Sequence, residues 1–274
     1  MADTAEVNSN IYNQIYDLQA VRRQDFLRAC HLAAQRSPGA GGIGTLSEKT
    51  LHAALKNYFE PYADNQETAI GRYVADIVGP QGIIEIQTRS LSRLHDKLQV
   101  FLEAARVTVV YPIAQVKWVC WLDPDTGELL SRRRSPKKGR PEHAFYELYR
   151  LADLLGHPNL QVCLVFLELE EYRQQNGYGR GKKRRATRYE CRPLDILDQR
   201  LFTGIDDWAA LLPKSMPQPF TTADYSSFAH LHLHTAQRAL ALLYKVGALQ
   251  RVGKQGRYYL YARPDPGRRP AIHE

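Results

Sequence analysis

Apolar residues recur along this chain with two periods, one typical of helices and one typical of strands. They recur at helical spacing between residues 11 and 35, and a second helical stretch covers 47–59. Strand-like runs, a further helix and another strand follow at 67–71, 72–78, 82–88, 91–105 and 107–111. The pattern therefore predicts an α/β core in which a helix, three strands, a helix and a strand succeed one another.

Further stretches flank and extend this core. We expect strands at 116–122 and 160–169 and a helix at 142–155. Residues 1–44 are expected to form a helical arm that ends in a glycine-rich linker, which lacks the Gly-Lys-Ser/Thr end of a phosphate-binding loop. We consider three sites on which the arm could pack: the core, a second copy of the chain in a homodimer, and a protein partner. The sequence of the arm does not decide between these.

The C-terminal stretch has a pattern of its own. A short helix is expected at 202–213, and a second helix begins after Thr221 or Thr222 as its cap. A third helix follows, and a β-hairpin with a basic, glycine-containing tip covers 248–261. The apolar face of the third helix is formed by Ala236, Leu240, Leu243 and Val246. We therefore expect three segments: the arm (1–44), an α/β domain (45–200) and a C-terminal domain (201–274).

Composition and charge narrow the functional classes. The chain has no apolar run long enough to span a membrane and no secretory signal, and its four cysteines are scattered, which predicts a cytoplasmic protein with free thiols.

Lys and Arg outnumber Asp and Glu by 37 to 29, and the surplus is concentrated in two acid-free segments, 131–140 and 180–188. Such segments either are solvated loops or bind a polyanion; we expect DNA, with RNA as the alternative, and hence a nucleoid-associated protein. The expected contacts are Arg132, Arg133, Arg134, Lys137, Lys138, Arg140, Lys182, Lys183, Arg184 and Arg185.

An acidic pair lies on the two strands of a predicted hairpin. Side chains two residues apart on a strand share a face, so Glu85 and Gln87 are expected to point one way, while Ile84 and Ile86 point into the core. The tight turn between the strands brings Asp76 beside Glu85. Two carboxylates and a backbone carbonyl favour Mg²⁺ or Mn²⁺ as a cofactor. The alternative is a surface acid pair in an ordinary hairpin.

The stretch Ala75-Asp76-Ile77-Val78, followed after the turn by Ile84-Glu85-Ile86-Gln87, resembles the PD-(D/E)XK nuclease superfamily. It is most similar to the competence protein CoiA group, in which Gln takes the last motif position. The resemblance covers roughly residues 45–115 and implies a restriction-endonuclease-like αβββαβ core with a mixed sheet. It also implies a metal-dependent nuclease that hydrolyses phosphodiester bonds of DNA, with Asp76, Glu85 and Glu48 as metal ligands and Gln87 positioning the water.

Three positions near this motif have competing interpretations. The superfamily lysine is replaced by Gln87, whose amide cannot supply positive charge, so Arg93 or Lys97 on the next helix is the expected substitute. Glu48 either completes the metal site or closes a capping box with Thr45 at the start of its helix. His52 either helps Glu48 and contacts phosphate or is a half-buried structural histidine.

The C-terminal order of helix, turn, helix and basic hairpin resembles the winged-helix family. The resemblance implies that the third helix enters the major groove with Gln237 and Arg238, while Lys254 and Arg257 contact phosphates. Winged helices also serve as protein-docking modules. The leading expectation is a nuclease directed to DNA by this module; the alternative, favoured by the missing lysine, is a catalytically inactive nuclease-fold DNA-binding protein that serves as a transcription regulator or adaptor.

Overall fold

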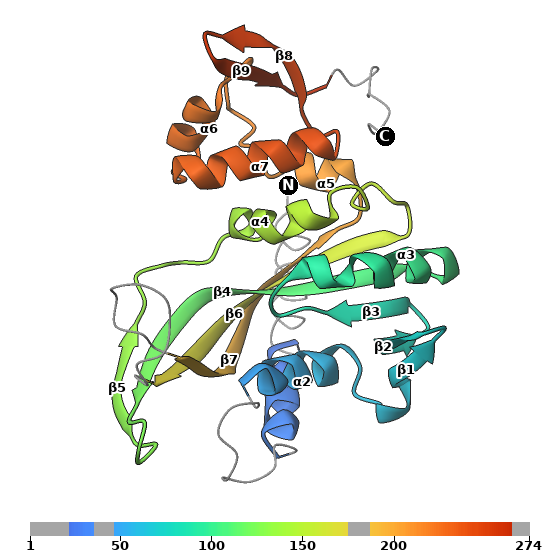
Figure 1. Cartoon of the computed structure of the whole chain (residues 1–274), viewed down its shortest axis with the longest axis vertical. Helices are drawn as coiled ribbons and strands as arrows, with labels where there is room; N and C mark the ends of the chain where they lie inside the picture. The colour runs from blue at the N-terminus through green and yellow to red at the C-terminus, as the bar shows by residue number, and fades with distance from the viewer. Residues whose placement is uncertain (1–21, 36–46, 175–186, 265–274) are drawn as a thin grey trace, which may run out of the picture. The chain divides into compact units, whose positions relative to one another are not determined.

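The computed structural model describes residues 22–35, 47–174 and 187–264, and it has a mixed α/β fold (Figure 1). In this part of the chain a seven-stranded sheet has the order β1-β2-β3-β4-β6-β7, with β5 paired to β4. Strands β2 and β3 pair antiparallel, whereas β3 and β4 pair parallel, so the sheet is mixed as expected. No helix among the described residues is long and apolar enough to span a membrane.

The elements at the start of the core follow the predicted order. Helix α2 (Ser47–Phe59) precedes β1 (Gln66–Ile70), β2 (Tyr73–Gly79) and β3 (Gly82–Ile86). The turn η2 (Leu91–Leu94), helix α3 (His95–Ala104) and strand β4 (Val107–Leu122) come next. The predicted succession of a helix, three strands, a helix and a strand is thus confirmed, and the expected strands at 107–111 and 116–122 prove to be one long strand.

The chain divides into two compact units. Unit 1 is built from residues 1–66, 114–138 and 166–198, and unit 2 from 67–113, 139–165 and 199–274. These units are built from separate stretches of the chain, so they do not test the predicted division into an arm, an α/β domain and a C-terminal domain.

In unit 1, part of the N-terminal arm packs on the core. The helix over 22–35 buries Phe26 completely, and the Phe26 ring meets the edge of Tyr58 in α2 at a centroid distance of 5.4 Å. Arg23 forms an ion pair of 2.8 Å with Asp195. Of the three expected destinations of the arm, these residues take the first; the first half of the arm lies outside the described residues.

The remaining strands of unit 1 were only partly predicted. Strand β5 (Leu129–Arg134) contains the arginines that we expected in a loop, because it pairs with β4 from Trp118 to Leu122. Strand β6 (Leu160–Gln174) runs five residues beyond its expected end, and β7 (Thr187–Phe202) was not expected. Strand pairing depends on partners that are distant in sequence. The length of β6 and the presence of β7 could therefore not be predicted from their own residues.

In unit 2 the tight turn between β2 and β3 depends on one glycine. Gly82 has a φ of +106°, and a Cβ there would lie 2.3 Å from the carbonyl oxygen of Arg106. Only a residue without a side chain fits this close approach. Helix α3 buries Leu98 and Phe101, and the Tyr73 ring of β2 meets Phe101 edge-on.

The prediction of one regular helix at 142–155 is wrong. The segment forms η3 (Pro141–His143), the single α-turn α4 (Phe145–Leu148) and η4 (Tyr149–Leu151). Phe145, Leu148 and Leu151 are completely buried. Their spacing of three residues matches the 3₁₀-helix, which has three residues per turn, better than the α-helix.

The C-terminal elements also belong to unit 2. Helix α5 (Ile205–Ala209) buries Trp208, which stacks on Phe202 at 4.3 Å. Helix α6 (Thr222–Phe228) begins with a capping box between Thr221 and Asp224, which confirms the predicted cap. Helix α7 (Leu233–Lys245) and the hairpin of β8 (Gln250–Gln255) and β9 (Tyr258–Ala262) complete the unit.

Candidate functional site

The β2–β3 hairpin places the predicted acidic pair side by side. The antiparallel register pairs Ile77 with Ile84, which sets Asp76 opposite Glu85. The backbone N–H of Asp76 donates to Oε1 of Glu85 at 3.1 Å, and the N–H of Ile86 donates to Oδ2 of Asp76 at 2.8 Å. Each carboxylate is thus held by the backbone of the opposite strand. The predicted juxtaposition of Asp76 and Glu85 is present in the structure.

Helix α3 supplies a cation to this pair. Nζ of Lys97 donates to Oε2 of Glu85 at 2.6 Å, and the same ammonium lies 5.4 Å from the centre of the Phe101 ring. The Lys97 side chain is 17% exposed and Glu85 only 1% exposed, so this ion pair is largely buried. Among the described contacts Lys97, and not the exposed Arg93, reaches the acidic pair. We call Asp76, Glu85 and Lys97 the acidic site.

Burial of Glu85 corrects the expected faces of β3. Ile83, Glu85 and Ile86 are buried, whereas Ile84 is half-buried, so the face that carries Glu85 is covered rather than open. Removal from water and repulsion by the Asp76 carboxylate raise the pKa of Glu85 to about 7, against the opposing effect of Lys97. A carboxyl group with this pKa exchanges its proton near neutral pH, which is a common property of functional sites.

The donor set of the acidic site suits a hard divalent cation. Two adjacent carboxylates concentrate negative charge, and Mg²⁺ binds through one or two carboxylates while keeping several waters. No group of three His, Cys, Asp or Glu side chains poised to hold a metal occurs among the described residues. The residues therefore fit a two-carboxylate site of the Mg²⁺ type and not a closed all-protein site.

The other residues predicted for this site have different placements. Gln87 is half-buried, and its backbone N–H donates to the Val110 carbonyl at 3.0 Å, which continues the pairing of β3 with β4. Glu48 lies in the first turn of α2, where its side chain falls outside the description. His52 lies half-buried in α2. Both belong to unit 1, so the metal-binding role of Glu48 and the helper role of His52 stay predictions.

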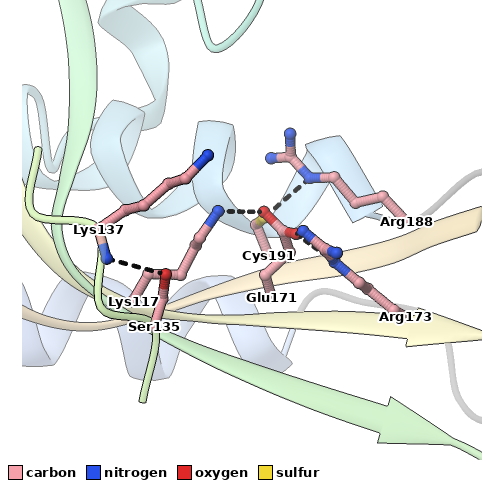
Figure 2. Close-up of polar contacts among 7 residues, drawn as sticks. All are labelled: Lys117, Ser135, Lys137, Glu171, Arg173, Arg188 and Cys191. Atoms are coloured by element: carbon pink, nitrogen blue, oxygen red, sulfur yellow. Dashed lines mark hydrogen bonds and ion pairs between the residues drawn. The ribbon is translucent and has the colours of Figure 1, made fainter. Parts of the chain in front are cut away.

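Unit 1 gathers basic side chains around one buried carboxylate. Figure 2 shows Lys117 of β4 and Arg173 of β6 reaching Glu171 from opposite sides, with Arg188 of β7 against Cys191 next to them. Nζ of Lys117 lies 3.2 Å from Oε2 of Glu171, and Nε of Arg188 lies 3.0 Å from Sγ of Cys191. Lys137 extends beside Lys117 from the segment after β5 (Figure 2). We call Lys117, Lys137, Arg173, Arg188 and Glu171 the basic cluster.

The basic cluster has a surplus of positive charge. Although burial raises the pKa of Glu171, Arg173 and Lys117 lower it below its ordinary value, so this carboxylate is charged at neutral pH. Lys117 and Arg173 contact this carboxylate and Lys137 and Arg188 lie beside them, so the basic cluster has more cations than carboxylates, which favours a polyanion. Lys117 and Arg173 were missed from the sequence because each stands alone in its strand; the signal was the i, i+2 spacing of Glu171 and Arg173 on one strand face.

The remaining basic candidates of segment 131–140 have several placements. Arg132 lies over the Trp118 ring at 3.9 Å and pairs with Glu170 at 2.7 Å, whereas Arg133, Arg134 and Lys138 are exposed. Nη1 of Arg140 donates to the Ala229 carbonyl at 2.9 Å, and its Nη2 donates to the buried Glu142 at 3.2 Å. Arg140 thus holds η3 against the end of α6. Lys182, Lys183, Arg184 and Arg185 lie outside the described residues.

The cations of α7 lie over aromatic rings of unit 2. The Arg238 guanidinium lies 3.9 Å from the centre of the Tyr146 ring, and the Lys245 ammonium lies 5.6 Å from that of Tyr149. Gln237 is exposed. On the hairpin, Lys254 lies 5.2 Å from the Tyr259 ring and Arg257 lies 5.1 Å from the Tyr258 ring. Lys254 and Arg257 are exposed, whereas Arg238 is half-buried against the Tyr146 ring.

All four cysteines are free, and Cys120, Cys163 and Cys191 are buried. Burial raises the pKa of the Cys163 thiol to about 12, so it is not a nucleophile at neutral pH.

Comparison with known proteins places residues 49–203, which include the acidic site, within a family model described as a domain of unknown function, DUF8091. An uncharacterized protein from Treponema pallidum (strain Nichols) is 31% identical over 226 residues, covering 82% of this chain and 89% of the relative. No solved structure matches the chain significantly.

Proposed function

The chain belongs to the DUF8091 family, and we propose that it is a divalent-metal-dependent nuclease that acts on DNA and has the acidic site as its catalytic centre. The observation that carries the proposal is the contact of Lys97 with Glu85. The Glu85 carboxylate also accepts a hydrogen bond from the backbone N–H of Asp76. A nuclease of this type needs two carboxylates for the metal and one cation near the reacting phosphate. The acidic site combines these groups within one hairpin and one helix.

Each residue of the acidic site has a role in this proposal. Asp76 and Glu85 hold Mg²⁺ or Mn²⁺ through their carboxylate oxygens, and the bound cation supplies Lewis acidity toward a water and the phosphodiester. Lys97 orients Glu85 and supplies the positive charge that Gln87 lacks. The Gln87 amide positions a water by hydrogen bonding.

The order of elements supports a restriction-endonuclease-like core. A helix, three strands, a helix and a strand succeed one another from α2 to β4, with the acidic pair across the second hairpin. The order from α6 to the β8–β9 hairpin likewise supports a winged-helix domain. In this proposal the basic cluster and the exposed arginines of β5 bind phosphates, which makes DNA affinity strongly dependent on salt.

Metal binding tests the proposal independently of the substrate. Titration of the chain with Mn²⁺, followed by the loss of the free-ion EPR signal, should show binding that Asp76→Asn and Glu85→Gln both weaken. These substitutions conserve size, and the side-chain amide introduced by Asp76→Asn retains an oxygen that accepts the Ile86 N–H. Binding that is unchanged in both variants would remove the acidic site from the metal chemistry.

A catalytically inactive DNA-binding protein is the second candidate, and one observation favours it. Glu85 is 1% exposed and is already paired with Lys97, so this carboxylate has a cation beside it without a metal. This candidate predicts salt-dependent DNA binding that is indifferent to Mg²⁺, Mn²⁺ and EDTA and no cleavage of any form of DNA. The nuclease proposal predicts the opposite on both counts.

A further inference from the structure

The hairpin formed by β8 and β9, residues 250–262, is a small basic surface that carries exposed aromatic rings. It contains Arg251, Lys254 and Arg257 and no carboxylate. Tyr258 is 48% exposed and Tyr259 is 40% exposed, so a large part of each side chain is open to solvent. Packing within the chain therefore does not account for these two tyrosines.

Every exposed ring on this hairpin has a cation against it. The register sets Lys254 directly opposite Tyr259, and Arg251 lies 3.9 Å from the centre of the same ring. On the neighbouring position, Nη2 of Arg257 donates to the Tyr258 hydroxyl at 2.8 Å. Aromatic faces that alternate with Lys and Arg are the surface on which single-stranded nucleic acid binds, because bases stack on the rings while the cations meet the phosphates.

Helix α7 also carries cations over exposed tyrosines, but those rings belong to a different segment. Its two permanently charged residues, Arg238 and Lys245, both lie over tyrosines of the 146–149 segment. On the hairpin, by contrast, the two exposed rings and the three cations belong to the same pair of strands and the turn between them.

We propose that the hairpin binds unpaired nucleotides of single-stranded DNA, with Tyr258 and Tyr259 as stacking surfaces and Arg251, Lys254 and Arg257 as phosphate contacts. In a duplex the faces of the bases are covered by their neighbours, so rings of the hairpin reach them only where the strand is unpaired. An acidic protein partner would satisfy the cations but would leave the exposed rings unexplained. The inference rests on the nucleic-acid-binding half of the proposed function and is independent of cleavage.

The test compares two labelled DNA molecules by fluorescence anisotropy, a 20-nucleotide oligothymidine and a 20-base-pair duplex. Both are titrated with the full chain in EDTA, so that cleavage cannot contribute. The single strand should bind more tightly, and Tyr258→Ala with Tyr259→Ala should weaken its binding roughly 10- to 100-fold while leaving duplex affinity nearly unchanged. Phe at both positions should retain the affinity, because the stacking face is kept.

Two matched variants sharpen the result. Tyr62, which is 72% exposed in unit 1, is the control position, and Tyr62→Ala should change neither affinity. Lys254→Ala with Arg257→Ala should weaken both DNA forms and reduce the slope of log affinity against log salt by about two. Thermal melting confirms that each variant is folded, and the Phe variants provide the comparison if the Ala pair is destabilised.

The outcomes separate this inference from the proposal on which it rests. Equal affinity of the Ala and Phe variants for the single strand, or a preference for the duplex, overturns the role of the hairpin while DNA binding stands. Failure of the chain to bind either DNA overturns the nucleic-acid half of the proposed function as well. Loss of single-strand affinity in the Ala variant alone supports the stacking role.

Discussion

Lys97 reaches across from α3 and donates a 2.6 Å hydrogen bond to the Glu85 carboxylate, which is almost completely buried. The cation that the β3 motif lacks is thus supplied from the next helix, twelve residues further along the chain. This contact links the fold to the proposed chemistry, because the same ion pair holds α3 against β3 and sets the charge of the acidic site.

Replacement of Lys97 by Met should damage both stability and cleavage. Met has a similar length but leaves Glu85 buried without its cation, which should lower the free energy of unfolding by about 1–3 kcal/mol. Cleavage should fall at least about 100-fold, a typical cost of removing one charge-stabilising donor. Urea unfolding and single-turnover cleavage measure the two effects.

Arg93→Ala is the matched control for this substitution. Arg93 is exposed and lies one turn earlier, so its removal should leave both quantities within error. Normal cleavage by both Lys97→Met and Arg93→Ala would mean that neither cation replaces the missing motif lysine.

The raised pKa of Glu85 predicts a pH dependence of stability in the metal-free protein. Its pKa is about 7 in the folded chain and about 4.3 in an unfolded one, so between these values the folded state holds a proton that the unfolded state has released. The free energy of unfolding should therefore fall as pH rises through this window, by about 4 kcal/mol at most. Glu85→Gln should remove this contribution, as thermal melting between pH 4.5 and 7.5 would show. A pH profile identical to that of the intact chain would assign the titration elsewhere.

Metal binding should have the opposite dependence on pH. Because a divalent cation binds the ionised carboxylate, Mn²⁺ affinity should rise about tenfold per pH unit below pH 7 and level off above it. Isothermal titration of the chain with Mn²⁺ at several pH values measures this directly. An affinity that is constant from pH 6 to 8 would exclude Glu85 as a ligand.

The basic cluster should contribute to DNA affinity without affecting specificity. Lys117→Ala and Arg173→Ala should each weaken DNA binding and reduce the salt slope by about one, since each removes a phosphate contact. Arg28→Ala, an exposed position in the same unit, serves as the control. Unchanged slopes for Lys117→Ala and Arg173→Ala would show that the cluster only stabilises the fold around Glu171.

Substitution of Arg140 should change stability, whereas substitution of Lys138 should change DNA binding. Arg140 holds the Ala229 carbonyl and Glu142, so Arg140→Ala should lower the free energy of unfolding by about 1–3 kcal/mol. Lys138 is exposed two residues earlier, and Lys138→Ala should leave stability unchanged and weaken DNA binding slightly. Equal melting temperatures for the two variants would contradict the structural role of Arg140.

The sequence predicted what depends on neighbours along the chain. The turn between β2 and β3 placed Asp76 beside Glu85, and helical spacing brought Lys97 forward as a substitute cation. The burial of Glu85 was not predictable, because it depends on what packs over that face of β3 and not on the alternation within the strand. Lys137 and Arg188 fall in the two basic segments that the sequence singled out, whereas Lys117 and Arg173 were missed for the same reason: they come from two other strands, and only the pairing order of the sheet brings the four together.

The most direct test of the nuclease proposal is cleavage of plasmid, linear, single-stranded and branched DNA in Mg²⁺ or Mn²⁺. The intact chain runs beside Asp76→Asn and Glu85→Gln, with EDTA in parallel. The proposal predicts cutting of at least one substrate by the intact chain, none in EDTA, and at least a 100-fold loss in both variants. Binding of the same substrates without any cutting, or cutting that survives both substitutions, would contradict it.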